Sequence, residues 1–346
     1  MRLATTLKFS PHEGGIGMDL VWEAERLGFD AVWAGEAYGA DAVTPVTWVL
    51  ARTSRIKAGT SIMQMPARTP TCAAMTALSL QALSGNRFLC GIGPSGPQVV
   101  EGWYGVPFGR PQTRTREYAA IIRQVFAREA PLEHHGYHYD IPYTGPGSTG
   151  LARQLRSTVH GQPGLKIYTA PISPAGLRTA GEIADGALPF FMSPEKAQVI
   201  VDPILEGRAK AGRSDDLADF DVAPYVRISM GDDLAACRDA LRPGLALYIG
   251  GMGAREQNFY NDLARRLGYE AEAAAIQDHF LAGRRGEAAA AVPDALIDEI
   301  SLVGPPDRIK DRLQAWKELA DYNWVGSLVL AGADAAAMRV VAEAVF

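Results

Sequence analysis

The sequence is poor in the features that mark membrane, secreted and metal-binding proteins. No apolar run reaches the roughly 18 residues that would span a bilayer, and the first residues lack the basic and apolar regions of a signal peptide. The only three cysteines among 346 residues are too scattered for a disulfide framework or a zinc site. We therefore expect a reduced, cytoplasmic protein without a metal or a membrane contact.

Positive charge is also in short supply. The chain has 39 acidic and 34 basic residues, which gives a formal net charge of −5. Nucleic-acid binding requires a basic surface, so this balance argues against a nucleic-acid partner and favours a small molecule. Apolar residues make up 47% of the chain, enough at this length to bury a large core without disulfide or metal support.

What the sequence does contain is a repeated alternation of short apolar strands and longer amphipathic helices. Strands are expected at 3–9, 29–34, 56–63, 87–92, 166–170, 186–190, 220–230 and 325–330. Helices are expected at 18–27, 42–53, 71–83, 113–128, 174–184, 194–211, 307–319 and 333–345. Eight such units predict a (β/α)₈ TIM barrel, an α/β fold whose active site lies at the C-terminal strand ends. An open, doubly wound sheet is the alternative that the count does not exclude.

Two segments interrupt this alternation within an expected single domain over residues 1–346. Residues 131–165 are rich in Gly, Pro, Tyr and His and have little periodicity. Long loops of this kind are usually functional, so this segment is a candidate lid. Residues 235–292 are Ala-rich and mostly helical, and we expect them to be an insertion between the last two strands.

The run Gly91-Ile-Gly93-Pro-Ser-Gly96 matches the dinucleotide-binding pattern G-x-G-x-x-G in an unfavourable context. A Rossmann site needs a helix that opens at the third glycine and a carboxylate about 20 residues later. Pro94 and Pro97 argue against that helix, and no such carboxylate closes a strand. We expect instead a tight turn or a phosphate cradle of backbone N–H groups.

Polar residues at other expected strand ends leave their roles open. Glu36, which follows the second strand, would either orient a loop through backbone N–H groups or perform acid–base work. Arg68 is either a solvated loop charge or part of the site. The group His134, His135 and His138 lies in an irregular segment without a supporting Cys or carboxylate at ligand spacing, so we expect a loop there.

Taken together, these residues resemble the luciferase-like monooxygenase superfamily, and within it the branch that uses the deazaflavin coenzyme F420. The resemblance covers nearly the whole chain, and its most specific run is Ser95–Gly105. It is densest in residues 23–41, 62–70, 83–105, 114–118 and 180–189.

The resemblance implies where the cofactor lies. In this family the third strand typically ends in a non-prolyl cis peptide behind the deazaflavin ring, here Ser61–Ile62, and Gln64 would lie near the polar edge of the ring. The ribityl and phosphate tail would be held by Gly93, Pro94, Ser95 and Gly96 and by Tyr168, Thr169, Ala170, Pro171 and Gly176. Glu36 and Tyr38 would face the substrate, and they are the candidate catalytic residues.

Two departures from the family pattern accompany this resemblance. Sugar-phosphate dehydrogenases of the family carry a catalytic His directly after the carboxylate, whereas this chain has Ala37. The usual Gly-Pro after the fifth strand is replaced by Ile172-Ser-Pro174.

The function that the resemblance implies is hydride transfer between F420 and a small organic substrate, by reduction of an activated C=C or C=N bond or oxidation of an alcohol. An FMN-dependent monooxygenase on the same barrel is the nearest alternative. A non-catalytic cofactor-binding protein and a metal-dependent barrel hydrolase are more distant ones. The resemblance also allows a homodimer, since members of the superfamily often pair through barrel helices.

Overall fold

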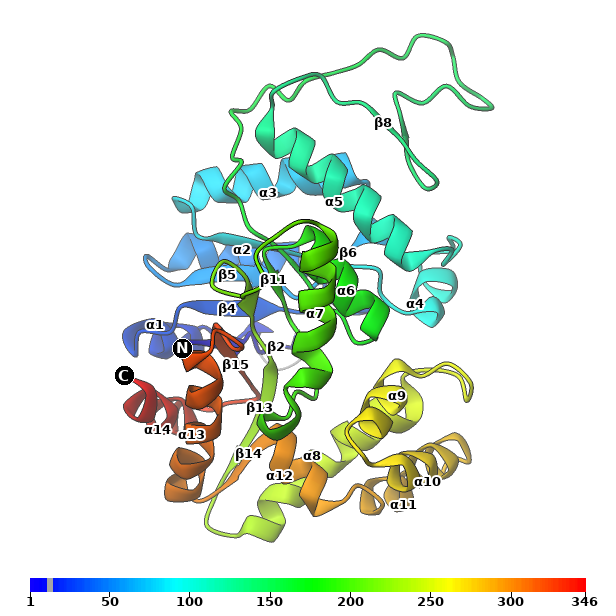
Figure 1. Cartoon of the computed structure of the whole chain (residues 1–346). Coiled ribbons are helices and arrows are strands. Elements are labelled where there is room, and N and C mark those ends of the chain that lie inside the picture. The colour runs from blue at the N-terminus through cyan, green and yellow to red at the C-terminus, as the bar shows by residue number, and fades with distance from the viewer. Residues whose placement is uncertain (11–14) are drawn as a thin grey trace.

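A curled sheet of parallel strands forms the centre of the protein, and helices cover its outer surface (Figure 1). The computed structural model describes residues 1–10 and 15–346. The strands of this sheet are β1 (Arg2–Thr6), β4 (Ala31–Ala34), β5 (Lys57–Thr60), β6 (Met63–Gln64), β7 (Phe88–Gly93), β10 (Ile167–Thr169), β11 (Gly186–Ala187), β12 (Asp221–Val222), β13 (Tyr225–Met230), β14 (Ser301–Gly304) and β15 (Ser327–Ala331). Two short antiparallel pairs lie outside it: β2 (Phe9–Ser10) with β3 (Gly15–Ile16), and β8 (His134–His135) with β9 (Asp140–Ile141).

The helices alternate with these strands along the chain. They are α1 (Met18–Arg26), α2 (Val43–Arg52), α3 (Pro70–Ser84), α4 (Pro97–Gly102), α5 (Pro111–Ala127), α6 (Pro174–Ile183), α7 (Gln198–Lys210), α8 (Leu234–Ala246), α9 (Phe259–Arg266), α10 (Glu270–Leu281), α11 (Arg285–Ala290), α12 (Asp294–Ile300), α13 (Pro306–Asp321) and α14 (Ala335–Val345). Short 3₁₀ turns η1 (Met65–Ala67) and η2 (Pro194–Lys196) and a π-helical turn η3 (Leu247–Gly251) complete the set.

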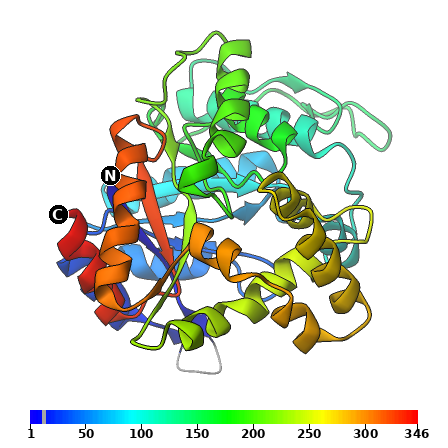
Figure 2. The same ribbon diagram turned by 60° about the horizontal axis from the view of Figure 1, so that its bottom comes forward.

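The segment 221–230 closes the sheet into a barrel. Its first part, β12, pairs with β11, and its second part, β13, pairs with β15, which in turn pairs with β1. Pro224 interrupts the segment because proline has no N–H to donate, yet its carbonyl still accepts from Val329 N at 3.0 Å. The two chain ends therefore lie close together, as Figures 1 and 2 show. The prediction of a parallel α/β barrel is confirmed, and the open doubly wound sheet is excluded.

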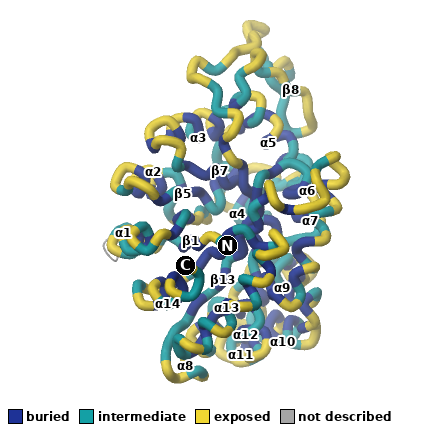
Figure 3. Tube along the Cα trace, turned by 60° about the vertical axis from the view of Figure 1, so that its left-hand side comes forward, coloured by how far each residue is buried: buried dark blue, intermediate teal, exposed yellow. Residues whose placement is uncertain are grey.

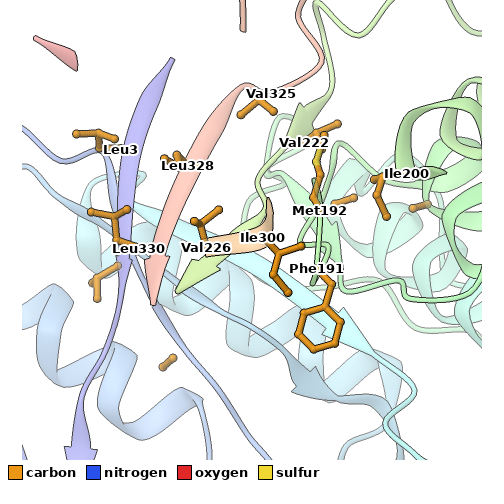
Figure 4. Packing of buried hydrophobic residues seen from close by; sticks show 14 of the residues in the cluster. Leu3, Phe191, Met192, Ile200, Val222, Val226, Ile300, Val325, Leu328 and Leu330 are labelled. Atoms are coloured by element: carbon orange, nitrogen blue, oxygen red, sulfur yellow. The ribbon is translucent and has the colours of Figure 1, made fainter. Parts of the chain in front are cut away.

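Two apolar layers hold the barrel, one on each face of the sheet. Figure 3 shows the buried strands at the centre and the exposed turns outside. The outer layer packs the strands against the helices; Figure 4 shows part of it, with Leu3, Leu328, Leu330 and Val226 from adjacent strands. The inner layer fills the barrel with side chains from the alternate positions, among them Ala4, Val329 and Trp33. This alternation is the period of two that a pleated strand imposes.

Glycines make room for the two largest side chains inside the barrel. Trp33 and Tyr168 meet edge to face, with ring centroids 5.1 Å apart. A Cβ on Gly59 would lie 2.4 Å from the Trp33 ring, and one on Gly186 would lie 2.3 Å from the Tyr168 ring. The short strands β5 and β11 therefore need glycine at these positions because the aromatic rings occupy the space of a side chain.

The structure corrects the predicted elements at three places. The expected third strand, 56–63, breaks into β5 and β6 around Ser61–Ile62, and the expected seventh, 220–230, breaks at Pro224. Strand β14 was missed, so the helical insertion lies between β13 and β14 rather than between the last two strands. A four-residue strand that is buried along its whole length has no alternating pattern to reveal it.

Candidate active site

The C-terminal ends of the strands surround a cavity of about 380 Å³. Its lining comes from β1, β4, β13, β14 and β15, from the segments that follow β5 and β11, and from the helical insertion after β13. The lining residues are Thr6, Leu7, Trp33, Gly35, Ser61, Phe190, Phe191, Tyr225, Arg227, Leu245, Tyr248, Ile300, Ser301, Ala331 and Gly332. A larger surface depression of about 590 Å³ lies between α12 and α13 on the outside of the barrel, away from the strand ends that carry the predicted site.

The Ser61–Ile62 peptide bond at the edge of this cavity is cis. This confirms the sequence prediction of a non-prolyl cis bond at the end of the third strand. The adjoining strand β7 has glycine where it passes this bond: a Cβ on Gly91 would lie 1.8 Å from Thr60 O, and one on Gly93 would lie 2.7 Å from Ile62 Cγ1. Gly93 is therefore required for the close packing of β7 against Ile62.

An ion pair fixes the loop after β4 to the segment after β5. The Glu36 carboxylate accepts hydrogen bonds from Arg68 Nη1 at 2.9 and 3.0 Å and from Gln64 N at 3.0 Å. Gln64 Nε2 donates in turn to Glu36 O and to Ala37 O. The Glu36 side chain is 5% exposed and that of Arg68 is 18% exposed, so solvent screens this pair little.

The contacts of Glu36 with Arg68 and Gln64 show which of the two predicted roles Arg68 has. They also bear on the predicted catalytic roles of Glu36 and Tyr38. Arg68 is a paired, largely buried cation and not a solvated loop charge. Glu36 orients a loop through Gln64 N, as in the first of its two predicted roles, and neither Glu36 nor Tyr38 lines the cavity. Tyr38 is 65% exposed. Catalysis by Glu36 or Tyr38 stays a prediction, and the geometry places other groups at the cavity.

The glycine-rich loop after β7 leads into a helix that the sequence analysis rejected. Helix α4 begins at Pro97, directly after Gly96. The proline is compatible with this start because the first turn of a helix needs no N–H donor there. Ser95 has a φ of +62°, which is uncommon for a residue other than glycine. The neighbouring strands form a barrel, so the match to the dinucleotide pattern lacks its Rossmann context.

The predicted tail-binding segment after β10 divides into two parts. The Tyr168 side chain points into the barrel, where its hydroxyl donates to Asp221 Oδ2 at 3.0 Å, so it packs the interior. Thr169 Oγ1 is buried without a hydrogen-bond partner among the described residues. Ala170 and Pro171 then lead to α6, whose N-cap Ser173 accepts from Gly176 N at 3.1 Å. This second part presents a helix N-terminus, which favours anions.

Arg266, which the sequence analysis missed, lies against this same segment. Its Nη2 donates to Ile172 O at 2.8 Å, and its Nε is buried without a partner among the described residues. Burial lowers the pKa of the guanidinium, and Asp262 opposes that shift. The residue ends α9, 94 positions further along the chain, so no local pattern could link it to the loop.

Aromatic rings form the cavity wall on the side of the helical insertion. Phe190 stacks on Tyr225 with centroids 5.1 Å apart, and Tyr248 approaches both Phe190 and Tyr260. Burial raises the pKa of the Tyr225 hydroxyl, which keeps it protonated, and the Ser61 side chain beside it opposes this shift. No described residue meets the geometry of a hydrogen bond with that hydroxyl. Its O–H therefore has no acceptor among the described residues.

The candidate lid, residues 131–165, contributes no lining residue to this cavity. Its β8–β9 hairpin lies along α5, where the Glu117 carboxylate accepts from the backbone N–H groups of Tyr137, His138 and Tyr139. His135 pairs with Asp140, and His138 contacts Arg110 O. In the part of the chain that the structure describes, no group of His, Cys, Asp and Glu side chains is arranged to hold a metal ion.

None of the helices among residues 1–10 and 15–346 has the length and apolar character that crossing a membrane requires.

Comparisons with known proteins agree with this architecture. The family model described as luciferase-like monooxygenase matches residues 16–322. A Mycobacterium tuberculosis protein with the provisional name coenzyme F420-dependent oxidoreductase is 43% identical over 275 residues, which are 79% of this chain and 79% of that protein.

Solved structures with the same fold include proteins that use either cofactor. The coenzyme F420-dependent tetrahydromethanopterin reductase of Methanopyrus kandleri has a TM-score of 0.78 at 24% identity, covering 100% of this chain and 97% of that one. The oxygenating constituent of 3,6-diketocamphane monooxygenase from Pseudomonas putida, in complex with FMN, has a TM-score of 0.64 at 19% identity, covering 100% and 98%.

Proposed function

Because this chain belongs to the luciferase-like monooxygenase family, we propose that it uses coenzyme F420 to transfer a hydride to or from a small organic substrate in the barrel mouth. The observation that carries the choice of cofactor is the 43% identity, over most of both chains, to a relative whose provisional name specifies F420.

The chemistry of the cavity wall supports a reaction that depends on a bound redox group. Its lining residues include no His, Cys, Lys, Asp or Glu, so within the described part of the wall no nucleophile is paired with a base. The polar side chains are hydroxyls, the Trp33 indole and the Arg227 guanidinium. Bound F420 would supply the ring carbon that gives or accepts the hydride.

The residues predicted to hold the cofactor fit such a group in three respects. The cis Ser61–Ile62 bond adjoins the cavity, and the glycines of β7 allow the backbone to approach it closely. Gln64 Oε1 and Thr169 Oγ1 are buried without partners among the described residues, which is costly unless a ligand satisfies them. The N-terminus of α6 and the Arg266 guanidinium lie at one segment and favour an anionic tail.

The chain's own side chains would then position the substrate and move the proton. Phe190, Tyr225 and Tyr248 form an apolar wall that excludes water from one side. The Tyr225 hydroxyl is protonated and free, so it can donate a hydrogen bond to a substrate oxygen or nitrogen. The Glu36–Arg68 pair would act at a distance by holding the loop segments in place.

Equilibrium binding of purified F420 and, separately, of FMN tests the cofactor assignment. Trp33 lines the cavity, so ring binding should quench its fluorescence, and a Trp33→Phe variant should lose much of that signal. We expect micromolar or tighter binding of F420 and much weaker binding of FMN. Tighter binding of FMN would overturn the deazaflavin assignment in favour of an oxygen-dependent monooxygenase. Binding of F420 without turnover across a broad substrate panel would favour a cofactor-binding protein.

A further inference from the structure

Among the described residues, one charged side chain lines the cavity, and no described carboxylate pairs with it. Arg227 is the only Lys, Arg, His, Asp or Glu among the described lining residues. Its side chain forms no hydrogen bond or ion pair with any described residue, and the guanidinium carbon lies 5.6 Å from the centroid of the Tyr248 ring. Arg68, which follows the third strand, is by contrast paired with Glu36.

The fold holds this cation in place. Gly244 on α8 lies against the guanidinium, and a Cβ there would be 3.1 Å from Nη1. Tyr248, one turn further along, faces it with its ring. Glycine within a helix is unfavourable relative to alanine, so its presence in α8 fits the need for space beside Arg227. The side chain is partly buried, and its position is therefore set by packing rather than by solvent.

Arg227 lies on the wall away from the segments that would hold the cofactor tail. Those segments follow β7 and β10, which are neighbours in the barrel, whereas Arg227 belongs to β13, which pairs with β14 and β15. Tyr225 precedes Arg227 by two residues on the same face, about 7 Å along the strand. The Tyr225 hydroxyl lies beside Ser61, at the cis bond, and Arg227 lies further toward the rim.

We propose that Arg227 binds a carboxylate of the substrate, so that the enzyme acts on organic acids. This proposal rests on the proposed function, because it assumes that the substrate occupies this cavity. A guanidinium matches a carboxylate through two parallel hydrogen bonds, and it strongly attracts an anion in a site that excludes water. A phosphate group is the weaker fit, because it typically takes several cationic or N–H donors and the described lining offers a single cation. The aromatic wall beside Arg227 suits an apolar body attached to the acid.

Benzoate and benzamide are a matched pair of probes for this proposal, since they share shape and differ in charge. Their dissociation constants would be measured by tryptophan fluorescence on the F420-loaded protein at neutral pH and low salt. We expect benzoate to bind at least about tenfold more tightly than benzamide, and this preference to weaken at high salt.

Three variants assign the preference to Arg227. Arg227→Gln should abolish it, Arg227→Lys should retain part of it, and both should bind F420 as the unmodified protein does. Arg255→Gln is the matched control, because it removes the same charge from an exposed ion pair with Asp278 in the helical insertion and should leave the preference unchanged.

Four results would overturn the proposal: no saturable benzoate binding, equal affinity for the two probes, a preference that survives in Arg227→Gln, or a loss of F420 affinity that parallels the loss of benzoate affinity. The last result would assign Arg227 to the cofactor. If the protein binds no F420, the proposed function fails, and the same comparison on the cofactor-free protein still decides whether Arg227 selects acids.

Discussion

Removing both partners of the Glu36–Arg68 pair should destabilise the protein less than the sum of the two single removals. Glu36→Gln takes the charge from a carboxylate that is 5% exposed and accepts three hydrogen bonds, and we expect a loss of about 2 kcal/mol in the free energy of unfolding. Arg68→Met leaves that carboxylate buried and uncompensated, and we expect a loss of about 3 kcal/mol. The double variant should lose about 3 kcal/mol, well below the sum of the two single losses.

The difference between the sum and the double variant is the coupling energy, here about 2 kcal/mol. It would be measured by urea unfolding followed by circular dichroism, with the thermal midpoint as a second probe. A loss of about 2 kcal/mol should lower that midpoint by roughly 3 °C in a chain of 346 residues. The more exposed Lys57–Asp30 pair is the control, where Asp30→Asn should cost under about 1 kcal/mol.

This cycle also separates positioning from catalysis at Glu36. A positioning role predicts that both single variants weaken F420 binding in parallel with stability. A catalytic role predicts that Glu36→Gln abolishes turnover while stability and F420 binding stay near those of the unmodified protein. Additive losses, with a coupling energy below about 0.5 kcal/mol, would refute the inference that the pair holds the two loop segments together.

Further predictions follow from other contacts. Gly93→Ala should weaken F420 binding at least about tenfold, because the added Cβ would lie 2.7 Å from Ile62 Cγ1. Gly102→Ala is the control: a Cβ at that position would have no atom within 4 Å, so this variant should bind F420 as the unmodified protein does in the same titration. Tyr225→Phe should leave the free energy of unfolding unchanged or raise it, because the hydroxyl is buried without a hydrogen-bond partner among the described residues. Substrate turnover should fall in the same variant. A clear loss of stability would contradict the inference that the hydroxyl has no partner. Arg266→Met should raise the dissociation constant of F420 without changing the ratio of benzoate to benzamide affinity, because the guanidinium holds the segment at Ile172. The Arg312 guanidinium lowers the pKa of Glu195 to about 2 from 4.5, so this carboxylate stabilises the fold above pH 4.5 and the effect is lost as the pH falls toward 2. Glu195→Gln should thus lower the free energy of unfolding by about 1 kcal/mol at pH 7, a figure that allows for the 49% exposure of the side chain. Near pH 2 the substitution should leave the free energy of unfolding unchanged. Urea unfolding across this pH range measures both values.

The sequence by itself determined the alternation of strands and helices, and with it the barrel. Strand and helix periods are local properties, and eight parallel strands of this kind have few ways to close. The residues after the third strand also carried a local signal, since the resemblance to the family placed a cis bond at Ser61–Ile62, where the structure has it. The extra strand β14 carried no such signal because all four of its residues are buried.

Only the tertiary structure decided which side chains face the cavity. Glu36 stands at a strand end, as predicted, yet Arg68 and Gln64 N occupy its carboxylate, because the loop after β5 folds back onto the loop after β4. The position of Arg227 near the end of an expected strand gave no information about its partners, and its isolation follows from the absence of a carboxylate among the described residues that line the cavity. Whether a charged group is paired depends on neighbours that lie far away in the chain, and packing alone brings those neighbours together.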